Sequence, residues 1–139
     1  MVSRVLVPMD HSDTSERALR YALEAHANAA ITVLHVVGEP TPMMGKATSL
    51  ALAEDVPMAA QEQARDIFER AEGVAETFDA EIETRVAFGN PAREILRHAA
   101  EYDTIVIGGH GGDLIGRLFV GDVAKAVFRR ARIPVTIVR

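Results

Sequence analysis

The chain alternates short apolar runs with longer segments in which apolar residues return every three or four positions. Continuous apolar runs lie at residues 4–8 (RVLVP), 31–37 (ITVLHVV), 104–108 (TIVIG) and 133–138 (IPVTIV). Such runs are typical of parallel strands that are buried on both faces. Residues 82–89 (IETRVAFG) instead alternate in character, which predicts a fifth strand with one less buried face, at the edge of a sheet.

Four helices are predicted between these strands, starting at residues 12, 58, 91 and about 119. Ser12 or Asp13 is expected to cap the first helix, with Glu16 forming a capping box with Asp13. Asn90 is the expected cap of the third helix, because Pro91 behind it suits the first helical position. The stretch between the second strand and the second helix, residues 38–57, has three prolines and no clear period and is predicted as a long connection.

The order strand, helix, strand, repeated to a fifth strand, predicts an α/β fold. We expect an open five-stranded parallel sheet with helices on both faces, a Rossmann-like three-layer sandwich, because each parallel connection must cross over the sheet. In such sheets ligands bind beyond the carboxyl ends of the strands, where the strand order reverses. The length of 139 residues, 48% of them hydrophobic, predicts one domain over residues 1–139.

Composition removes several function classes. The net charge of -5 and the scattered basic residues disfavour nucleic acid and anionic membranes as partners. The absence of cysteine excludes disulfides, thiolate catalysis and cysteine-based metal sites, and the five histidines show no metal-binding spacing. The first ten residues (MVSRVLVPMD) carry an apolar run too short for a signal peptide or a membrane span, so the cytoplasm is the expected compartment.

Six glycines fall within residues 107–128 (IGGHGGDLIGRLFVGDVAKAVF). Gly108, Gly111 and Gly121 would let main-chain amides approach an anion, with Gly121 where the fourth helix begins. The alternative is a tight connection that lets a strand and a helix pack closely. Neither the dinucleotide fingerprint GxGxxG nor the P-loop GxxxxGK[ST] is present in this segment, so those two kinds of phosphate site are excluded.

The spacing of glycine, two residues, glycine, nine residues and glycine resembles the nucleotide loop of the universal stress protein family. Four other segments are similar to that family: VLVPMDHSDTSERALRYAL, TVLHVV, GNPAREIL and RIPVTIVR. The resemblance implies an adenine nucleotide alpha hydrolase-like sheet, a cytoplasmic homodimer paired through the last strand and, in one branch, bound ATP. The residues that it marks as nucleotide-binding are Pro8, Met9, Asp10, Val36, Gly108, Gly111, Arg117, Gly121, Asp122 and Val123.

Within this resemblance, Asp10 would hold the ribose or the adenine edge and Val36 would bond adenine through its main chain. Arg117 matches a basic position often found in the family. Asp122 departs from the pattern, because ATP-binding members carry Ser or Thr there. A carboxylate about 4 Å from a phosphate costs roughly 1 kcal/mol in water and about 4 at an intermediate dielectric. A magnesium or manganese ion bridging Asp122 to the phosphates, or a helix-capping role for Asp122, would explain its presence.

The sequence therefore predicts a stress-response protein that binds ATP as a sensor and is not an enzyme, since no general base or metal cluster accompanies the loop. The alternative is a dimeric interaction module that binds no nucleotide and uses residues 38–57 as a partner surface. An enzyme that forms adenylated intermediates is disfavoured, because PMDHSDTS after the first strand has no glycine. A phosphoacceptor receiver domain is disfavoured as well, since Asp10 stands alone and VAFGN ends without an acid.

Overall fold

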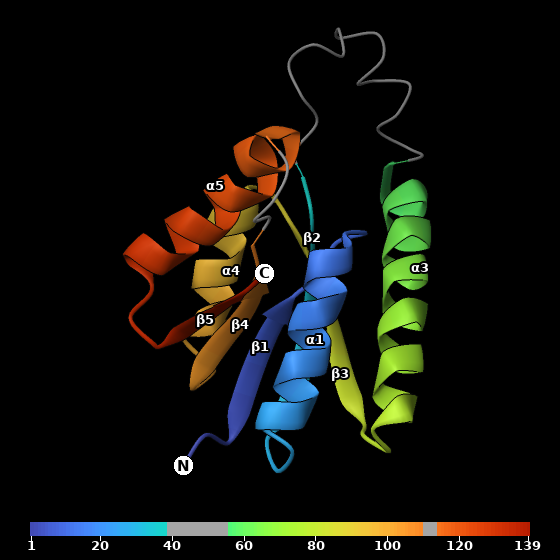
Figure 1. Ribbon diagram of the computed structural model, residues 1–139. Helices are drawn as coiled ribbons and strands as arrows, with labels where there is room; N and C mark the ends of the chain where they lie inside the picture. Colours follow the sequence, from blue (N-terminus) through green and yellow to red (C-terminus); the bar gives the residue numbers. More distant parts are fainter. Residues whose placement is uncertain (39–55, 110–113) are drawn as a thin grey trace, which may run out of the picture.

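The computed structural model describes residues 1–38, 56–109 and 114–139, with backbone alone for 56–57, 59–60 and 114–120. Strands and helices alternate along the sequence as predicted, and the fold class is confirmed (Figure 1). The elements in order are β1 (Arg4–Pro8), α1 (Asp13–Ala25), β2 (Ala30–Val37), α3 (Val56–Thr77), β3 (Ile82–Phe88), α4 (Pro91–Ala99), β4 (Thr104–Gly108), α5 (Leu114–Arg130) and β5 (Val135–Val138).

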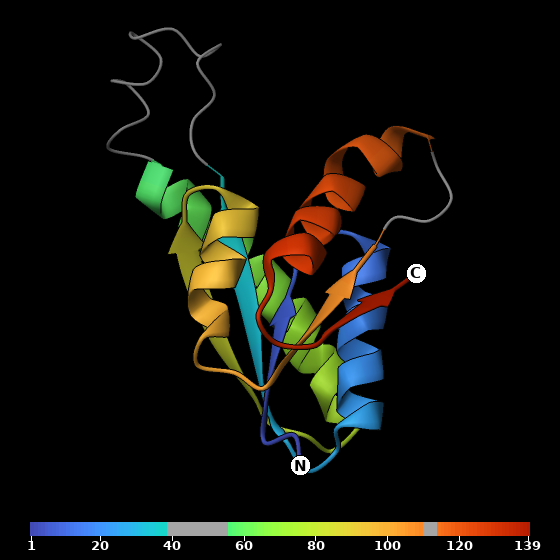
Figure 2. The ribbon, with the colours of Figure 1, turned by 90° about the vertical axis from the view of Figure 1, so that its left-hand side faces the viewer.

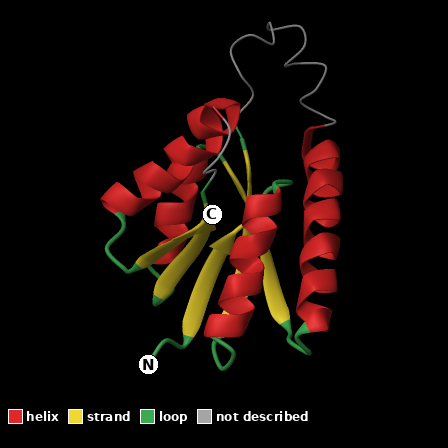
Figure 3. Ribbon diagram, in the orientation of Figure 1, coloured by secondary structure: helices red, strands yellow, loops and turns green. Residues whose placement is uncertain are grey.

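All five strands are parallel and lie in the order β3-β2-β1-β4-β5. The chain moves outward from β1 to β3 and then returns to the other side of β1 with β4. Strand order therefore reverses between β1 and β4, which is where parallel sheets hold their ligands. The strands lie as one sheet between two layers of helices (Figure 3), and their carboxyl ends point upward in Figure 1.

The sheet has a separate apolar core on each face. Val5 and Val7 of β1 pack with α1 and α3, whereas Leu6 packs on the opposite face with α4 and α5. Figure 2 shows α4 and α5 in front of the sheet. All three of these β1 side chains are fully buried, so the continuous apolar run was correctly interpreted as a strand covered on both faces.

The strand β3 lies at the edge of the sheet, as its alternating pattern predicts. One of its faces is less buried, as the same pattern predicts, and it is the face that carries Val86 and Phe88. Val86 is 38% exposed and Phe88 is 58% exposed, whereas Ala87 on the other face is buried. An edge strand has a neighbour on one side alone, so its apolar face is only partly covered by the helix above it.

Several predicted boundaries are corrected by the structure. The last helix, α5, begins at Leu114 and not near residue 119, because the apolar spacing continues through the glycines that suggested a loop. The helix α3 begins two residues earlier than predicted, and β5 begins two residues later, after Pro134, whose carbonyl accepts a hydrogen bond from the Ile105 N–H. Asn90 caps α4 as expected: its Oδ1 accepts from the Arg93 N–H at 3.0 Å, and Pro91 follows.

The carboxylate of Asp103, just before β4, anchors the start of β1. Its Oδ2 accepts hydrogen bonds from the main-chain N–H groups of Ser3 and Arg4, both at 2.9 Å. These two bonds, Ser3 first, lower the pKa of the Asp103 carboxyl below its ordinary value of 3.8. A lowered folded-state pKa gives stability that is complete above the unfolded-state pKa and is lost as the pH falls through the folded-state pKa.

We therefore expect Asp103→Asn to destabilise the protein by a constant amount above about pH 5. This difference in the free energy of unfolding should shrink as the pH falls below 3.8. Urea denaturation of both proteins between pH 7 and pH 2 measures it, with the exposed Glu24→Gln as a control for the loss of one negative charge. Parallel pH profiles for wild type and Asp103→Asn would contradict this account of the carboxylate.

Candidate functional site

A cavity of about 140 Å³ lies at the carboxyl ends of β1, β2 and β4, at the reversal of strand order. Apolar side chains form most of its wall. The sequence-predicted residues that line it are Pro8, Met9, Asp10, Val36, Gly108 and Val123. The structure thus brings together residues from the ends of three strands and from α5, at the place where the strand order predicts a ligand.

The main-chain groups of Val36 face this cavity. Successive residues of a strand turn their N–H and C=O groups to opposite neighbours. Leu34 O accepts from Met9 N–H at 2.8 Å on the β1 side, and Val37 O accepts from Gly89 N–H at 2.9 Å on the β3 side. Val36 therefore turns its N–H and C=O toward the β1 side. The β1–β2 register ends at Pro8 and Leu34, so these two groups point into the space beyond the end of β1.

The turn after β1 is held in place from β2. Besides the bond from the Met9 N–H to Leu34 O, the Met9 carbonyl lies 3.0 Å from Nδ1 of His35. A carbonyl oxygen can only accept, so Nδ1 of His35 carries the proton. His35 is buried and itself lines the cavity. The cavity wall formed by Pro8 and Met9 is therefore fixed by side-chain and main-chain bonds to the neighbouring strand.

Asp10 has a structural role at the entry to α1. Its Oδ1 accepts from the Ser12 N–H at 2.8 Å, and Ser12 is the N-cap, with its Oγ accepting from the Ser15 N–H at 3.2 Å. The Ser15 hydroxyl lies 3.1 Å from the Asp10 carbonyl and donates to the main chain of this turn. The carboxylate is half-buried and lines the cavity, so its position suits contact with a ligand as well.

The predicted capping box between Asp13 and Glu16 is wrong. Both carboxylates instead bind Arg70 of α3: Nη2 donates to Asp13 Oδ1 at 2.8 Å and Nε donates to Glu16 Oε1 at 3.1 Å. Nη1 of Arg70 also donates to the His11 carbonyl at 3.0 Å. The bond to Glu16, followed by that to Asp13, raises the pKa of the Arg70 guanidinium. One side chain of α3 therefore fastens the turn that leads from β1 into α1.

Gly108 allows a close approach between β4 and α1. A Cβ atom at this position would lie 2.7 Å from both atoms of the Thr14 carbonyl group and 2.8 Å from the Ser15 N. Backbone atoms in the first turn of a helix cannot move away cheaply, so glycine is required here by packing alone. The close-packing interpretation of the glycine segment thus holds for Gly108, which also lines the cavity.

Gly121 does not lie where the sequence predicts. Because α5 starts at Leu114, Gly121 is inside the helix and its N–H is not one of the free groups at a helix start. Among the described atoms, none lies within 4 Å of a Cβ placed there. A glycine inside a helix costs roughly 0.5–1 kcal/mol relative to alanine, and packing among the described residues does not explain it.

Asp122 is not placed to cap a helix either, since it too lies inside α5. Its side chain is exposed and borders a separate surface hollow with Lys125, Arg129 and Arg130. Within the described residues it does not line the cavity. Two of the predicted positions cannot be placed: Gly111 and the side chain of Arg117 lie outside the described residues.

Sequence reasoning missed half of the cavity wall. The further lining residues are Ser12, Ser15, Leu34, His35, Pro91, Ile95 and Ile107. Each lies within two positions of a predicted residue or in the first turns of a predicted helix. Taking every residue within two positions of a predicted strand end would have found His35 and Ile107, whereas the place of Ile95 depends on how α4 packs on the sheet.

The described ranges contain no group of three or more His, Asp or Glu side chains placed to hold a metal ion. No helix among the described residues is long and apolar enough to cross a membrane.

Comparison with known proteins agrees with this geometry. The model of the universal stress protein family matches residues 1–139. The chain belongs to the universal stress protein family. This family member is 30% identical to the universal stress protein YxiE of Bacillus subtilis (strain 168), over 100% of the length of both proteins. The resemblance drawn from the five sequence segments is thus confirmed.

Solved structures of universal stress proteins share the fold. UspA from Lactobacillus plantarum is 27% identical with a TM-score of 0.71, over 99% of this protein and 98% of that one. A universal stress protein solved in complex with cAMP is 30% identical with a TM-score of 0.71, over 99% of this protein and 97% of that one. The parallel sheet with two helical layers is therefore the fold of this universal stress protein.

Proposed function

We propose that this universal stress protein binds adenine nucleotides, with the adenine ring in the cavity beyond the end of β1. The observation that carries the proposal is the orientation of Val36, whose N–H and C=O face an apolar cavity. Adenine carries an amino donor beside ring-nitrogen acceptors. A neighbouring N–H and C=O of one strand residue match that edge, whereas guanine presents a carbonyl oxygen where adenine has its amino group.

The size of the cavity suits the base alone. Its volume of about 140 Å³ is below the roughly 300–1,000 Å³ of sites that enclose a drug-sized ligand. The ribose would then lie at the mouth, beside the half-buried carboxylate of Asp10, and the phosphates would lie beyond the end of β4 at Gly108. The relative of 30% identity solved with cAMP supports an adenine ligand. ATP, with magnesium or manganese, is the specific ligand that we propose.

We further propose that the protein is a cytoplasmic sensor and not an enzyme, and that it works as a homodimer paired through β5. Among the described residues, no acid or histidine other than Asp10 and His35 lines the cavity. The Nδ1 of His35 is held by the Met9 carbonyl and Oδ1 of Asp10 accepts from the Ser12 N–H, so both side chains hold the turn after β1. The pairing is supported by β5 forming the second edge of the sheet, where Ile137 is 41% exposed.

Calorimetric titration with AMP, ATP and GMP tests the proposed function. We expect AMP and ATP to bind and GMP to bind at least tenfold more weakly, because the carbonyl of guanine would oppose the Val36 C=O. Hydrolysis of ATP should stay at the rate in buffer. No heat from AMP or ATP at millimolar concentration would refute nucleotide binding and would favour the interaction module. Its predicted surface at residues 38–57 lies outside the described residues, apart from residue 38 and the backbone of residues 56–57.

Asp122→Ser tests where the phosphates lie. Since Asp122 does not line the cavity, we expect the Kd for AMP to stay within about twofold. Removing a negative charge near a triphosphate should lower the Kd for ATP by about fivefold, the equivalent of roughly 1 kcal/mol. An unchanged Kd for ATP in the same titration would show that the triphosphate does not approach this part of α5.

A further inference from the structure

The free edge of the sheet along β3 carries backbone groups that face outward. The Gly89 N–H donates to Val37 O on the β2 side, so the odd-numbered residues of β3 turn their N–H and C=O toward β2. Alternation then turns those of Ile82, Thr84 and Val86 outward. Within the described sheet, β3 has β2 as its one neighbour. An edge of this kind is a template for another strand unless something blocks it.

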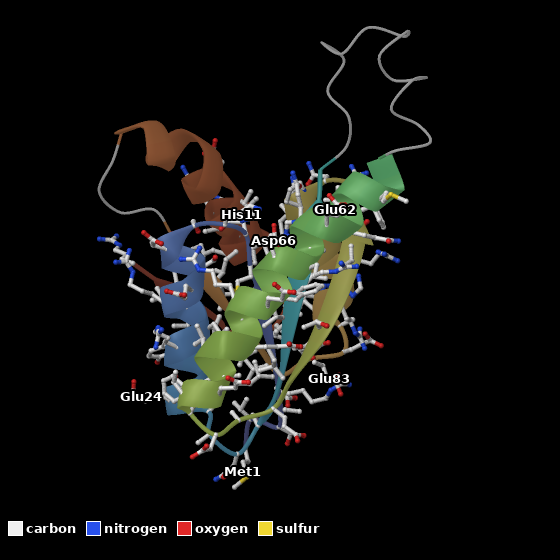
Figure 4. All side chains as sticks on the ribbon, turned by 90° about the vertical axis from the view of Figure 1, so that its right-hand side faces the viewer. Met1, His11, Glu24, Glu62, Asp66 and Glu83 are labelled. Atoms are coloured by element: carbon white, nitrogen blue, oxygen red, sulfur yellow. The ribbon has the colours of Figure 1, made fainter. Side chains whose placement is uncertain are left out.

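The side chains along this edge are exposed on both faces. On the α3 face, Thr84 and Val86 are exposed and Ile82 is half-buried. On the other face, Glu83 is exposed, and Arg85 pairs with Glu101 at 2.6 Å while remaining one-third exposed. Figure 4 faces α3 and β3 and labels Glu83 on the outer side of the strand.

This five-residue sequence, IETRV, is complementary to itself when two copies run antiparallel about Thr84. Ile82 then lies opposite Val86 of the second copy, Glu83 lies opposite Arg85, and Thr84 lies opposite Thr84. Each apolar residue then lies opposite an apolar residue, and each charged residue lies opposite one of the other sign. By symmetry, each of these two kinds of pair occurs twice. Such directly opposed pairs stabilise antiparallel strands by roughly 0.2–1 kcal/mol each.

The hydrogen-bond phase fits the same register. Directly opposed residues of antiparallel strands alternate between pairs that exchange N–H and C=O bonds and pairs that do not, so outward-facing residues must lie opposite outward-facing residues. Thr84 faces outward, as do Ile82 and Val86. A two-fold axis between two residues would place an outward-facing residue opposite an inward-facing one, so the backbone allows only registers that are centred on a residue. The backbone phase therefore allows the register centred on Thr84, and the charge pattern selects it, because a register centred on Arg85 would place Arg85 opposite Arg85.

We propose that two copies of this protein associate through β3, antiparallel and centred on Thr84, so that two five-stranded sheets become continuous. A groove of about 420 Å³ beside the strand supports this pairing. Its lining includes Thr84 and Val86 and, from α3, Ala64, Phe68 and the charged side chains of Arg65, Glu69 and Glu72. Side chains directly opposite each other lie on the same face of a sheet, so Ile82 of the second copy enters this groove beside Val86.

The proposal is independent of nucleotide binding and of the pairing through β5, because β3 and β5 are opposite edges of the sheet. If both edges pair, assemblies larger than a dimer result. If β5 does not pair, β3 alone gives a dimer. Comparing wild type with β3 variants therefore tests pairing through β3, whether or not β5 pairs.

Charge reversal tests the register. Glu83→Arg alone places Arg opposite Arg, and Arg85→Glu alone places Glu opposite Glu, at both symmetric pairs. In sedimentation velocity, we expect the wild-type mass to rise with concentration to at least twice that of either variant. An equimolar mixture of the two variants restores both opposite-charge pairs, so its mass should return to that of wild type. Circular dichroism melting checks the fold of each variant, because Arg85→Glu also removes the bond to Glu101.

Val86→Pro tests the backbone hydrogen bonds. Proline removes an N–H that faces outward and is not used in the pairing with β2, and edge strands tolerate proline at such positions. We expect Val86→Pro to reduce the mass as Glu83→Arg does, while Val86→Thr, which keeps the N–H, assembles like wild type. Equal masses for wild type, Glu83→Arg and Val86→Pro from micromolar to millimolar concentration would overturn the proposal. So would a mixture of the two charge variants that fails to recover.

Discussion

Gly108→Ala is expected to lower the free energy of unfolding by about 2 to 3 kcal/mol, in the upper range for overpacking of a close contact. The added Cβ would meet backbone atoms of Thr14 and Ser15 at 2.7 to 2.8 Å. Relief requires β4 and α1 to move apart, and β4 lies inside the sheet. Thermal unfolding followed by circular dichroism measures the effect as a fall in Tm of roughly 4 °C for each kcal/mol in a protein of this size.

Gly121→Ala is the matched control. No described atom lies within 4 Å of the added Cβ, and alanine is favoured over glycine inside a helix, so we expect a gain of roughly 0.5–1 kcal/mol. Equal Tm values for the two variants would contradict the distinction drawn between these glycines. If Gly121→Ala weakens ATP binding while raising Tm, then glycine at position 121 contributes to ligand binding and not to the stability of the fold.

Val123→Phe is expected to weaken AMP binding by at least tenfold, which corresponds to about 1.4 kcal/mol. Val123 is half-buried on α5 and lines the cavity, while packing against the core formed by α4 and α5. A benzyl group at this position projects into a space of about 140 Å³ and competes with the base for it. Calorimetric titration with AMP gives the Kd of both proteins.

Lys125→Phe makes the same kind of change two residues away, on an exposed position of the same helix. It should leave the Kd for AMP unchanged within about twofold, because Lys125 does not line the cavity. Both variants should retain the Tm of wild type within a few degrees. Equal affinities of Val123→Phe and wild type for AMP would mean that the base does not occupy this cavity.

Hydrophobic patterning was sufficient for the fold class. Buried parallel strands consist of continuous apolar residues, so Val5, Leu6 and Val7 indicate a covered strand without any knowledge of their neighbours. Caps with a strong local preference were also predictable, as with Asn90 before Pro91. The cap of α1 was not settled by sequence, because Glu16 binds Arg70, which lies 54 residues away in the sequence.

The site was predictable in outline, since strand ends can be identified from the sequence and parallel strands end at one side of a sheet. Two of its properties depend on tertiary structure. The packing role of Gly108 comes from the approach of β4 to α1. The direction of the Val36 N–H and C=O follows from where β1 stops relative to β2, and a register between strands is not a property of either strand alone.

The start of α5 was misplaced because glycines at residues 116 and 121 resemble a loop when propensity is considered alone. That error assigned helix-terminal roles to Gly121 and Asp122, which both lie inside the helix. Tertiary packing of Ala124 and Val127 against the sheet outweighs the cost of glycine in this helix.

The most direct test follows the Val36 amide by 15N–1H correlation NMR during titration with AMP. If adenine bonds to this strand, the Val36 N–H resonance should shift with the same saturation curve that calorimetry gives. The amide of Val33, buried deeper in β2, should stay in place. Saturable AMP binding that leaves the Val36 amide unmoved would show that adenine binds elsewhere and would contradict the account.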